Sequence, residues 1–137
     1  MGKEETSGRP VRWLSELGID DVPLVGGKNA SLGEMVSRLG PHGVAVPEGF
    51  ATTAGAYRDF VAANDLEKRI GEELARYRED PDRLHEVGGA IRALLGGAAL
   101  PEGLEQALRA AYAELAGRCG EAEPAVAVRS SATAEDL

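Results

Sequence analysis

Pairs of helix-breaking residues divide most of this sequence into segments that carry the apolar spacing of amphipathic helices. The breakers are Gly40-Pro41, Asp80-Pro81 and Gly96-Gly97. Between them, apolar residues recur three or four positions apart, which is the repeat of a helix with one buried face. The pattern predicts helices over these ranges: the stretch after Thr52 and Thr53, about 65–78, about 82–95, and 101–117.

Three short apolar runs predict strands among these helices: Val11–Leu14, Val44–Pro47 and a buried strand over Ala125–Val128. The predicted fold class is therefore α+β, helix-rich with a few short strands. Residues 1–10 are polar and charged, and we interpret them as a disordered lead-in.

The composition excludes several classes of function. A net charge of −8 without a basic patch argues against nucleic-acid binding. The apolar runs are far shorter than the ~20 residues that cross a bilayer, so no membrane segment is predicted. The single cysteine, Cys119, cannot form an internal disulfide, which favours a cytoplasmic protein. Neither His42 nor His85 has a partner at metal-ligand spacing, and no metal site is predicted.

A glycine pair and a lysine precede the first predicted helix. Gly26 and Gly27 allow a close approach of the backbone, and Lys28 adds a positive charge where the helix begins. Such a turn can bind an anion, most plausibly a phosphate. It is not a Walker A loop, because Val22 stands at the position of its first glycine. A surface helix with a solvated lysine remains the alternative.

The helix that follows this turn is predicted to bury one apolar face. The apolar residues of that face stand at positions i, i+3, i+4 and i+7: Leu32, Met35, Val36 and Leu39.

A second cation follows the predicted strand at 125–128. Arg129 is succeeded by Ser130 and Ser131, so a guanidinium and two hydroxyls could hold phosphate oxygens together. The alternative is an arginine that pairs with Glu135 or Asp136 in a flexible tail.

Three stretches in this order resemble the N-terminal nucleotide-binding domain of the phosphoenolpyruvate synthase (pyruvate, water dikinase) family. They are Val-Gly-Gly-Lys-Asn-Ala-Ser-Leu-Gly-Glu-Met at 25–35, Val-Pro-Glu-Gly-Phe-Ala-Thr-Thr at 46–53 and Val-Arg-Ser-Ser-Ala-Thr-Ala-Glu-Asp-Leu at 128–137. Pyruvate phosphate dikinase and rifampicin phosphotransferase share the general pattern. The resemblance covers about residues 11–137, as the N-terminal portion of an ATP-binding domain.

The resemblance implies the first subdomain of an ATP-grasp-like nucleotide-binding fold, with ATP as its ligand. It implies that Lys28 and Arg129 contact the ATP phosphates and act in catalysis. The other cofactor-binding residues that it implies are Gly26, Gly27, Ser130 and Ser131.

The resemblance also implies a reaction. Enzymes of this family convert ATP, pyruvate and water to phosphoenolpyruvate, AMP and phosphate through a phosphohistidine. The Mg²⁺ ligands, the phosphohistidine and the pyruvate site are then expected beyond residue 137, in the remainder of a parent enzyme. This chain alone is expected to be inactive. Two alternatives stay open: a stand-alone nucleotide- or protein-binding regulatory module without catalysis, and a helical interaction domain.

Overall fold

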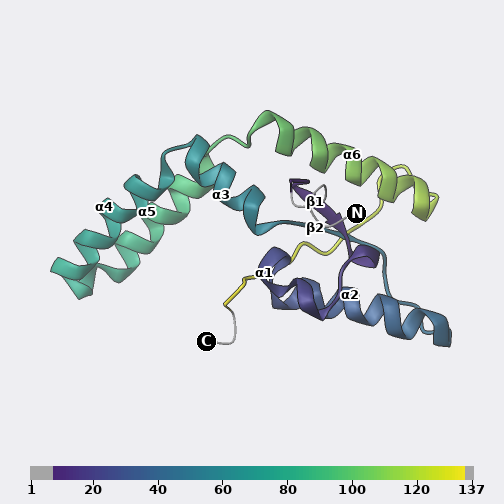
Figure 1. Ribbon diagram of the computed structural model, residues 1–137. Coiled ribbons are helices and arrows are strands. Elements are labelled where there is room, and N and C mark those ends of the chain that lie inside the picture. Colours follow the sequence, from purple (N-terminus) through teal and green to yellow (C-terminus); the bar gives the residue numbers. More distant parts are fainter. Residues whose placement is uncertain (1–7, 135–137) are drawn as a thin grey trace. The chain divides into compact units, whose positions relative to one another are not determined.

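The computed structural model describes residues 8–134, which form a helix-rich chain with one small sheet (Figure 1). The strands are β1 (Val11–Trp13) and β2 (Phe50–Thr52). The α-helices are α1 (Val22–Val25), α2 (Gly27–Leu39), α3 (Ala54–Ala63), α4 (Leu66–Glu79), α5 (Leu84–Gly97) and α6 (Glu102–Cys119). The helix-rich α+β class is confirmed. No helix in the described part of the chain is long and apolar enough to cross a membrane.

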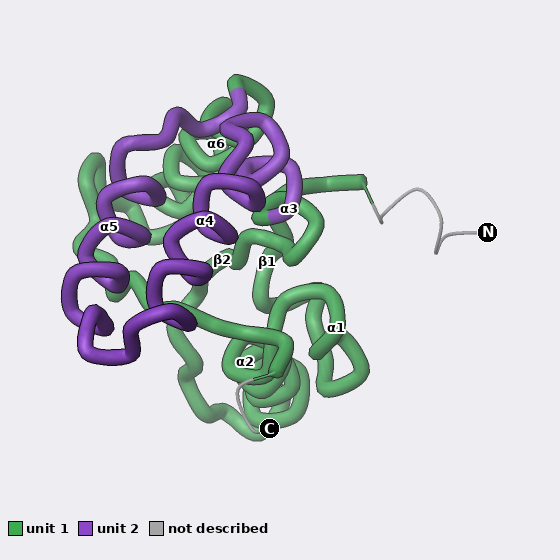
Figure 2. The backbone as a smooth tube through the Cα atoms, turned by 90° about the vertical axis from the view of Figure 1, so that its left-hand side faces the viewer, with its two compact units in different colours: residues 1–57, 102–137 green, residues 58–101 purple. Residues whose placement is uncertain are grey.

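The chain divides into two compact units, coloured green and purple in Figure 2. Unit 1 contains residues 1–57 and 102–137, and unit 2 contains residues 58–101. All six residues predicted for the phosphate site belong to unit 1.

The sheet of unit 1 is an antiparallel pair in which Arg12 lies opposite Ala51. Two further backbone hydrogen bonds extend the pairing: Thr53 N donates to Pro10 O and Leu14 N donates to Gly49 O, both at 3.0 Å. The strand that we predicted at Val44–Pro47 is wrong, because these residues pair with no strand in the described part of the chain. The residues that pair with β1 follow them, at Phe50–Thr52.

Small residues bring α2 against the segment that follows β1. Ala30 is fully buried, and a β-carbon added to Gly33 would lie 2.5 Å from the Leu17 carbonyl oxygen. The predicted apolar face of α2 is only partly correct. Leu32 and Val36 are half-buried against the core, whereas Met35 and Leu39 are exposed. The core of this region consists of Leu14, Leu17, Val25, Ala30 and Ala51.

An aromatic pair and an arginine connect α6 to the sheet. Trp13 and Phe50 pack edge to face, with ring centroids 5.6 Å apart. The Arg118 guanidinium of α6 lies 3.8 Å from the Trp13 ring centroid, a cation–π contact, and it also pairs with Glu48 at 3.5 Å. α6 runs to Cys119, two residues past the predicted end.

Unit 2 is chiefly a hairpin of α4 and α5, which lie side by side (Figure 1). Leu66 and Val87 are buried. Arg76 of α4 pairs with Glu73 in its own helix and with Glu86 of α5, and the second pair links the two helices. Asp80 and Pro81 end α4 as predicted, but a 3₁₀ turn at Pro81–Arg83 delays α5 to Leu84, whose side chain is exposed.

Candidate functional site

The glycine–lysine turn that the sequence predicts lies at the junction of α1 and α2. The one-turn helix α1 ends at Val25, Gly26 follows as its C-cap, and α2 begins at Gly27. Gly26 has φ +85°, a conformation that residues with a β-carbon seldom adopt. Asn29 steadies the turn, because its side-chain amide donates to Val25 O at 2.9 Å.

The segment after Arg129 lies directly against this turn. Gly27 N donates to Ala132 O at 3.2 Å, and the Lys28 amine donates to Ser130 O at 3.4 Å. In Figure 1 the yellow C-terminal segment runs from the end of α6 to the junction of α1 and α2. The structure therefore brings together two stretches of sequence about a hundred residues apart.

The close approach permitted by Gly26 is made to the protein itself. A β-carbon built on Gly26 would lie 2.3 Å from Ser131 Oγ and 2.9 Å from both the backbone nitrogen and the carbonyl oxygen of Ala132. On that side of Gly26, Ser131 and Ala132 occupy the space that a phosphate would need. The glycine thus joins the two halves of the site.

The two serine side chains beside the turn differ in burial and in hydrogen bonding. Ser131 Oγ is buried and makes no hydrogen bond with the described residues. A buried hydroxyl without a partner costs free energy and is a natural place for a further polar group. Ser130 is exposed.

Arg129 is also exposed, and its backbone adjoins the Ser130 carbonyl that accepts from Lys28. Consecutive Cα atoms are about 3.8 Å apart, so the backbone of Arg129 lies close to the lysine contact. The pairing of Arg129 with Glu135 or Asp136, which we considered from sequence, lies outside the described residues.

Ala132 was missed in the sequence analysis. Its contribution is a backbone carbonyl that accepts from Gly27. Any residue type can supply a backbone carbonyl, so the sequence does not reveal this contact. The only sequence signal is the small size of the alanine side chain.

The strand predicted at Ala125–Val128 is wrong. No strand forms there, and the side chains of Val126 and Val128 are exposed. An apolar run becomes a buried strand only when neighbouring strands pair with its backbone and other elements cover its faces. Within residues 8–134, β1 and β2 pair only with each other.

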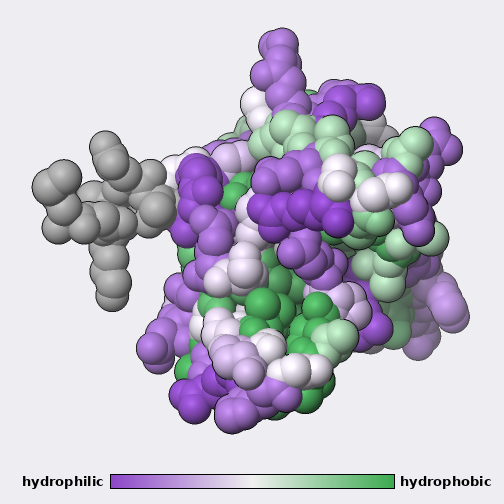
Figure 3. Space-filling view, turned by 90° about the vertical axis from the view of Figure 1, so that its right-hand side faces the viewer, coloured by the Kyte–Doolittle hydropathy of each residue, from purple (hydrophilic) through white to green (hydrophobic). Residues whose placement is uncertain are grey.

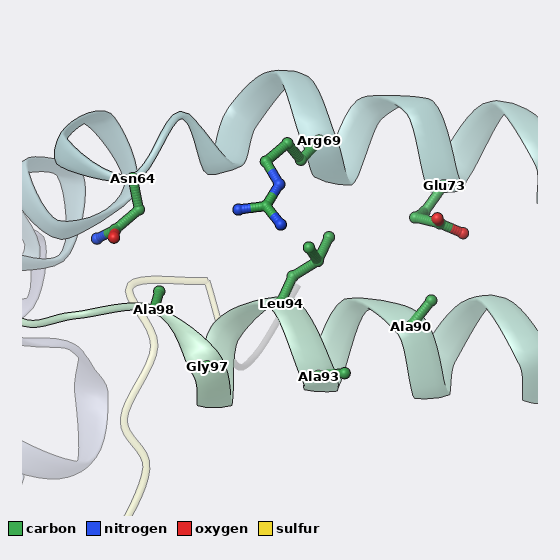
Figure 4. A pocket seen from close by; sticks show the side chains of 8 residues that line it. All are labelled: Asn64, Arg69, Glu73, Ala90, Ala93, Leu94, Gly97 and Ala98. Carbon is green, nitrogen blue, oxygen red and sulfur yellow. The ribbon is translucent and has the colours of Figure 1, made fainter.

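A pocket of about 430 Å³ lies within unit 2, between α4 and α5 (Figure 4). Ala90, Ala93 and Gly97 of α5 line it, so the space results from short side chains. The Asn64 amide at its edge already donates to Phe60 O and Ala99 O. None of the predicted site residues lines this pocket. Among residues 8–134, no group of three or more His, Cys, Asp or Glu side chains could hold a metal ion.

The fold and the site together define a helix-rich α+β domain in which a glycine–lysine turn is joined to an arginine–serine segment. Residues 22–137 match the family of the pyruvate phosphate dikinase, AMP/ATP-binding domain. The chain therefore belongs to this family, and the resemblance seen in the sequence is confirmed.

Curated relatives are phosphoenolpyruvate synthases. The chain is 51% identical to that of Neisseria meningitidis serogroup B over 128 residues, which make up 93% of this chain and 16% of the relative. It is 52% identical to that of Pseudomonas aeruginosa over 125 residues (90% and 16%), and 44% identical to that of Escherichia coli K12 over 128 residues (93% and 16%). The chain thus spans about a sixth of the length of these relatives.

Proposed function

We propose that this chain supplies the phosphate-binding part of the ATP site of a phosphoenolpyruvate synthase. The observation that carries the proposal is the contact of Gly27 and Lys28 with Ser130 and Ala132. That contact places a lysine amine next to an arginine-bearing segment at the start of a 13-residue helix. Family membership and the names of the relatives support ATP as the ligand.

In this proposal Lys28 and Arg129 bind the phosphates and neutralise charge that develops during phosphoryl transfer. Ser130, which is exposed beside the lysine contact, would donate to a phosphate oxygen, and the buried Ser131 Oγ would do so after its side chain turns away from Gly26. Gly26 and Gly27 hold the two segments together. The local positive charge matters because the chain as a whole carries −8.

The complete reaction would need further domains, and the relatives, which are about six times as long as this chain, have room for them. We propose an ATP-grasp-like closure over the nucleotide, Mg²⁺ held by groups outside this chain, and a phosphohistidine and pyruvate site in the remainder of the enzyme. ATP, pyruvate and water would then give phosphoenolpyruvate, AMP and phosphate. The 137-residue chain alone would bind nucleotide without turnover.

The test is a titration of the ¹⁵N-labelled chain with MgATP, followed by NMR. We expect shifts at Gly27, Lys28, Ser130 and Ser131. A hydrogen bond to a charged group is worth about 1.5–3 kcal/mol, so Lys28→Ala should weaken binding by roughly 10- to 100-fold. Arg129→Ala should do the same.

Matched controls are Lys68→Ala in α4 and Arg109→Ala in α6, whose side chain is 78% exposed and pairs with Glu105. Both should bind MgATP like the wild type. Equal MgATP affinity of the Lys28→Ala and control variants would show that Lys28 does not bind the nucleotide.

A further inference from the structure

The pocket between α4 and α5 holds a cation that has no counter-ion. Arg69 of α4 points into the space between the two helices, toward Leu94 of α5 (Figure 4). Its side chain makes no hydrogen bond or ion pair with residues 8–134. Glu73, one helical turn further along α4, would be the usual partner. The Glu73 carboxylate instead pairs with Arg76 at 2.7 Å and is turned away from Arg69. The Arg69 guanidinium is therefore open to an anionic ligand.

One end of the pocket offers hydrogen-bond acceptors. α5 ends there at Gly97, and Ala98 follows in an extended conformation. The carbonyl oxygens of Leu95, Gly96 and Gly97 accept no hydrogen bond from the described residues. The Asn64 side chain presents another acceptor oxygen, because both of its hydrogen bonds are made by the amide nitrogen. Since a helix C-terminus also carries partial negative charge, this end favours a positively charged donor.

The floor of the pocket is apolar. Ala90, Ala93 and Leu94 of α5 line it, and the volume of about 430 Å³ lies within the range of about 300–1,000 Å³ that is typical of small-molecule sites. An arginine fork binds a carboxylate through two parallel hydrogen bonds. A ligand that matches all three features carries a carboxylate, an ammonium group and a short aliphatic body.

Apolar residues are also exposed in unit 1. They include Met35 and Leu39 at the end of α2 and Val44 in the loop that follows. Figure 3 shows apolar side chains, in green, at the surface of the face that lies to the right in Figure 1. Exposed apolar side chains do not by themselves specify a ligand. The pocket of unit 2 does, because it combines an apolar floor with a guanidinium and a set of carbonyl acceptors.

We propose that this pocket binds the zwitterion of a small aliphatic α-amino acid, such as leucine or valine. The ligand carboxylate accepts hydrogen bonds from Arg69, and the ammonium group donates to the Asn64 oxygen and to the carbonyls at the end of α5. The aliphatic side chain lies on Ala90 and Ala93. Because the ligand contacts both helices, its binding also stabilises the hairpin of unit 2. The site shares no residue with the proposed phosphate site, which belongs to unit 1.

The test is a titration of the ¹⁵N-labelled 137-residue chain with L-leucine, followed by NMR. We expect saturable shifts of the Arg69 Nε–H, the Asn64 side-chain amide and the Ala98 backbone amide. The Gly27 amide in unit 1 should not shift. Shifts that are absent, or that do not saturate, would overturn the proposal.

Two analogues of leucine test the two charged groups separately. Leucinamide lacks the carboxylate, and 4-methylpentanoate lacks the ammonium group. Each should bind at least about 10-fold more weakly than leucine, because it forgoes hydrogen bonds between charged and polar groups. Binding of 4-methylpentanoate as tight as that of leucine would overturn the assignment to an amino acid. Equally tight binding of leucinamide would overturn the role of Arg69.

Two variants of the pocket give an independent readout. Arg69→Gln should weaken leucine binding by about 10-fold or more. Arg78→Gln, on the same helix and outside the pocket, is its matched control and should bind leucine like the wild type. Ala93→Leu fills the floor at an exposed position, so it should abolish leucine binding and leave the melting temperature of the free chain unchanged. Wild-type leucine affinity in Arg69→Gln or in Ala93→Leu would contradict the site.

The two proposals can fail separately. Arg69→Gln should bind MgATP like the wild type, and Lys28→Ala should bind leucine like the wild type. Loss of leucine binding in Arg69→Gln with no MgATP binding by any variant would refute the phosphate site and keep the amino-acid site. MgATP binding that depends on Lys28, with no leucine binding by the wild type, would do the reverse.

Discussion

Gly26 and Ser131 are separated by 105 positions in the sequence, yet a β-carbon on the glycine would lie 2.3 Å from the serine hydroxyl oxygen. That distance is well below van der Waals contact, so a side chain at position 26 would force the two segments apart. The absence of a side chain is what lets the arginine segment lie on the glycine–lysine turn.

Gly26→Ala should therefore destabilise unit 1 by two separate effects. The positive φ costs about 1–2 kcal/mol in any residue with a β-carbon, and displacement of Ser131 and Ala132 adds to that cost. Gly43→Ala is the control for a positive φ in open space, because Gly43 has φ +79° and nothing within 4 Å of its β-carbon position. Its ψ of 10° is left-handed helical, whereas the ψ of 166° at Gly26 belongs to a region that is essentially restricted to glycine, so part of the difference between the variants is backbone strain. Urea unfolding followed by fluorescence of Trp13, the only tryptophan, measures both variants.

We expect the midpoint of Gly26→Ala to lie below that of Gly43→Ala. The Gly27 amide, which donates to Ala132 O, should also exchange faster in Gly26→Ala than in the wild type, and should be unchanged in Gly43→Ala. A lower midpoint with unchanged exchange of the Gly27 amide would assign the loss to backbone strain, and equal midpoints would show that the contact with Ser131 contributes nothing.

Gly33 makes a second contact of this kind, between α2 and Leu17. Its β-carbon would lie 2.5 Å from both the β-carbon and the carbonyl oxygen of Leu17. Gly33→Ala should destabilise unit 1 by about 1–3 kcal/mol, the usual cost of overpacking a core. Gly71→Ala in α4, where nothing lies within 4 Å, should instead stabilise its helix by up to about 1 kcal/mol. Circular dichroism melts of the two variants should shift in opposite directions.

The helices were predictable from sequence because their signals are local. Apolar spacing and the breakers at Gly40, Pro81 and Gly97 located four of them to within a few residues. The two misplaced strands have non-local causes. Pairing with β1 selected Phe50–Thr52 over Val44–Pro47. Ala125–Val128 has strand composition but no partner among the described residues.

The candidate site was predictable to a similar degree. The turn and the arginine segment were visible as motifs, and their convergence was expected only through the resemblance. The sequence could not indicate why position 26 must be a glycine: the space of its missing β-carbon is occupied by Ser131 and Ala132. That purpose depends on a tertiary contact between chain segments about a hundred residues apart.

Thr53 should be the functional N-cap of α3. Its hydroxyl oxygen accepts from the Ala56 N–H at 3.1 Å, and Thr53 itself is buried. Thr53→Ala should cost about 1 kcal/mol, and Thr53→Ser should recover most of that loss because it keeps the acceptor. Thermal melts of both variants test this, with Thr52→Ala at the exposed neighbouring position as the control. A Thr53→Ser variant as unstable as Thr53→Ala would argue that the methyl group, not the cap, matters.

Glu34 should make part of the stability of unit 1 depend on pH. A hydrogen bond from Arg38, and a second from the Ile19 N–H at 3.0 Å, hold the pKa of Glu34 below its ordinary value. A carboxyl whose pKa is lowered in the folded state stabilises the fold above its unfolded pKa, near 4.5, and loses that contribution as the pH falls through the folded value.

Glu34→Gln should therefore be less stable than the wild type at pH 7, and the difference should shrink below about pH 4. Arg38→Gln removes the first hydrogen bond and keeps the Ile19 contact, so its pH dependence should lie between the two. Urea midpoints from pH 3 to 7 measure the three proteins, and parallel curves for wild type and Glu34→Gln would exclude this linkage.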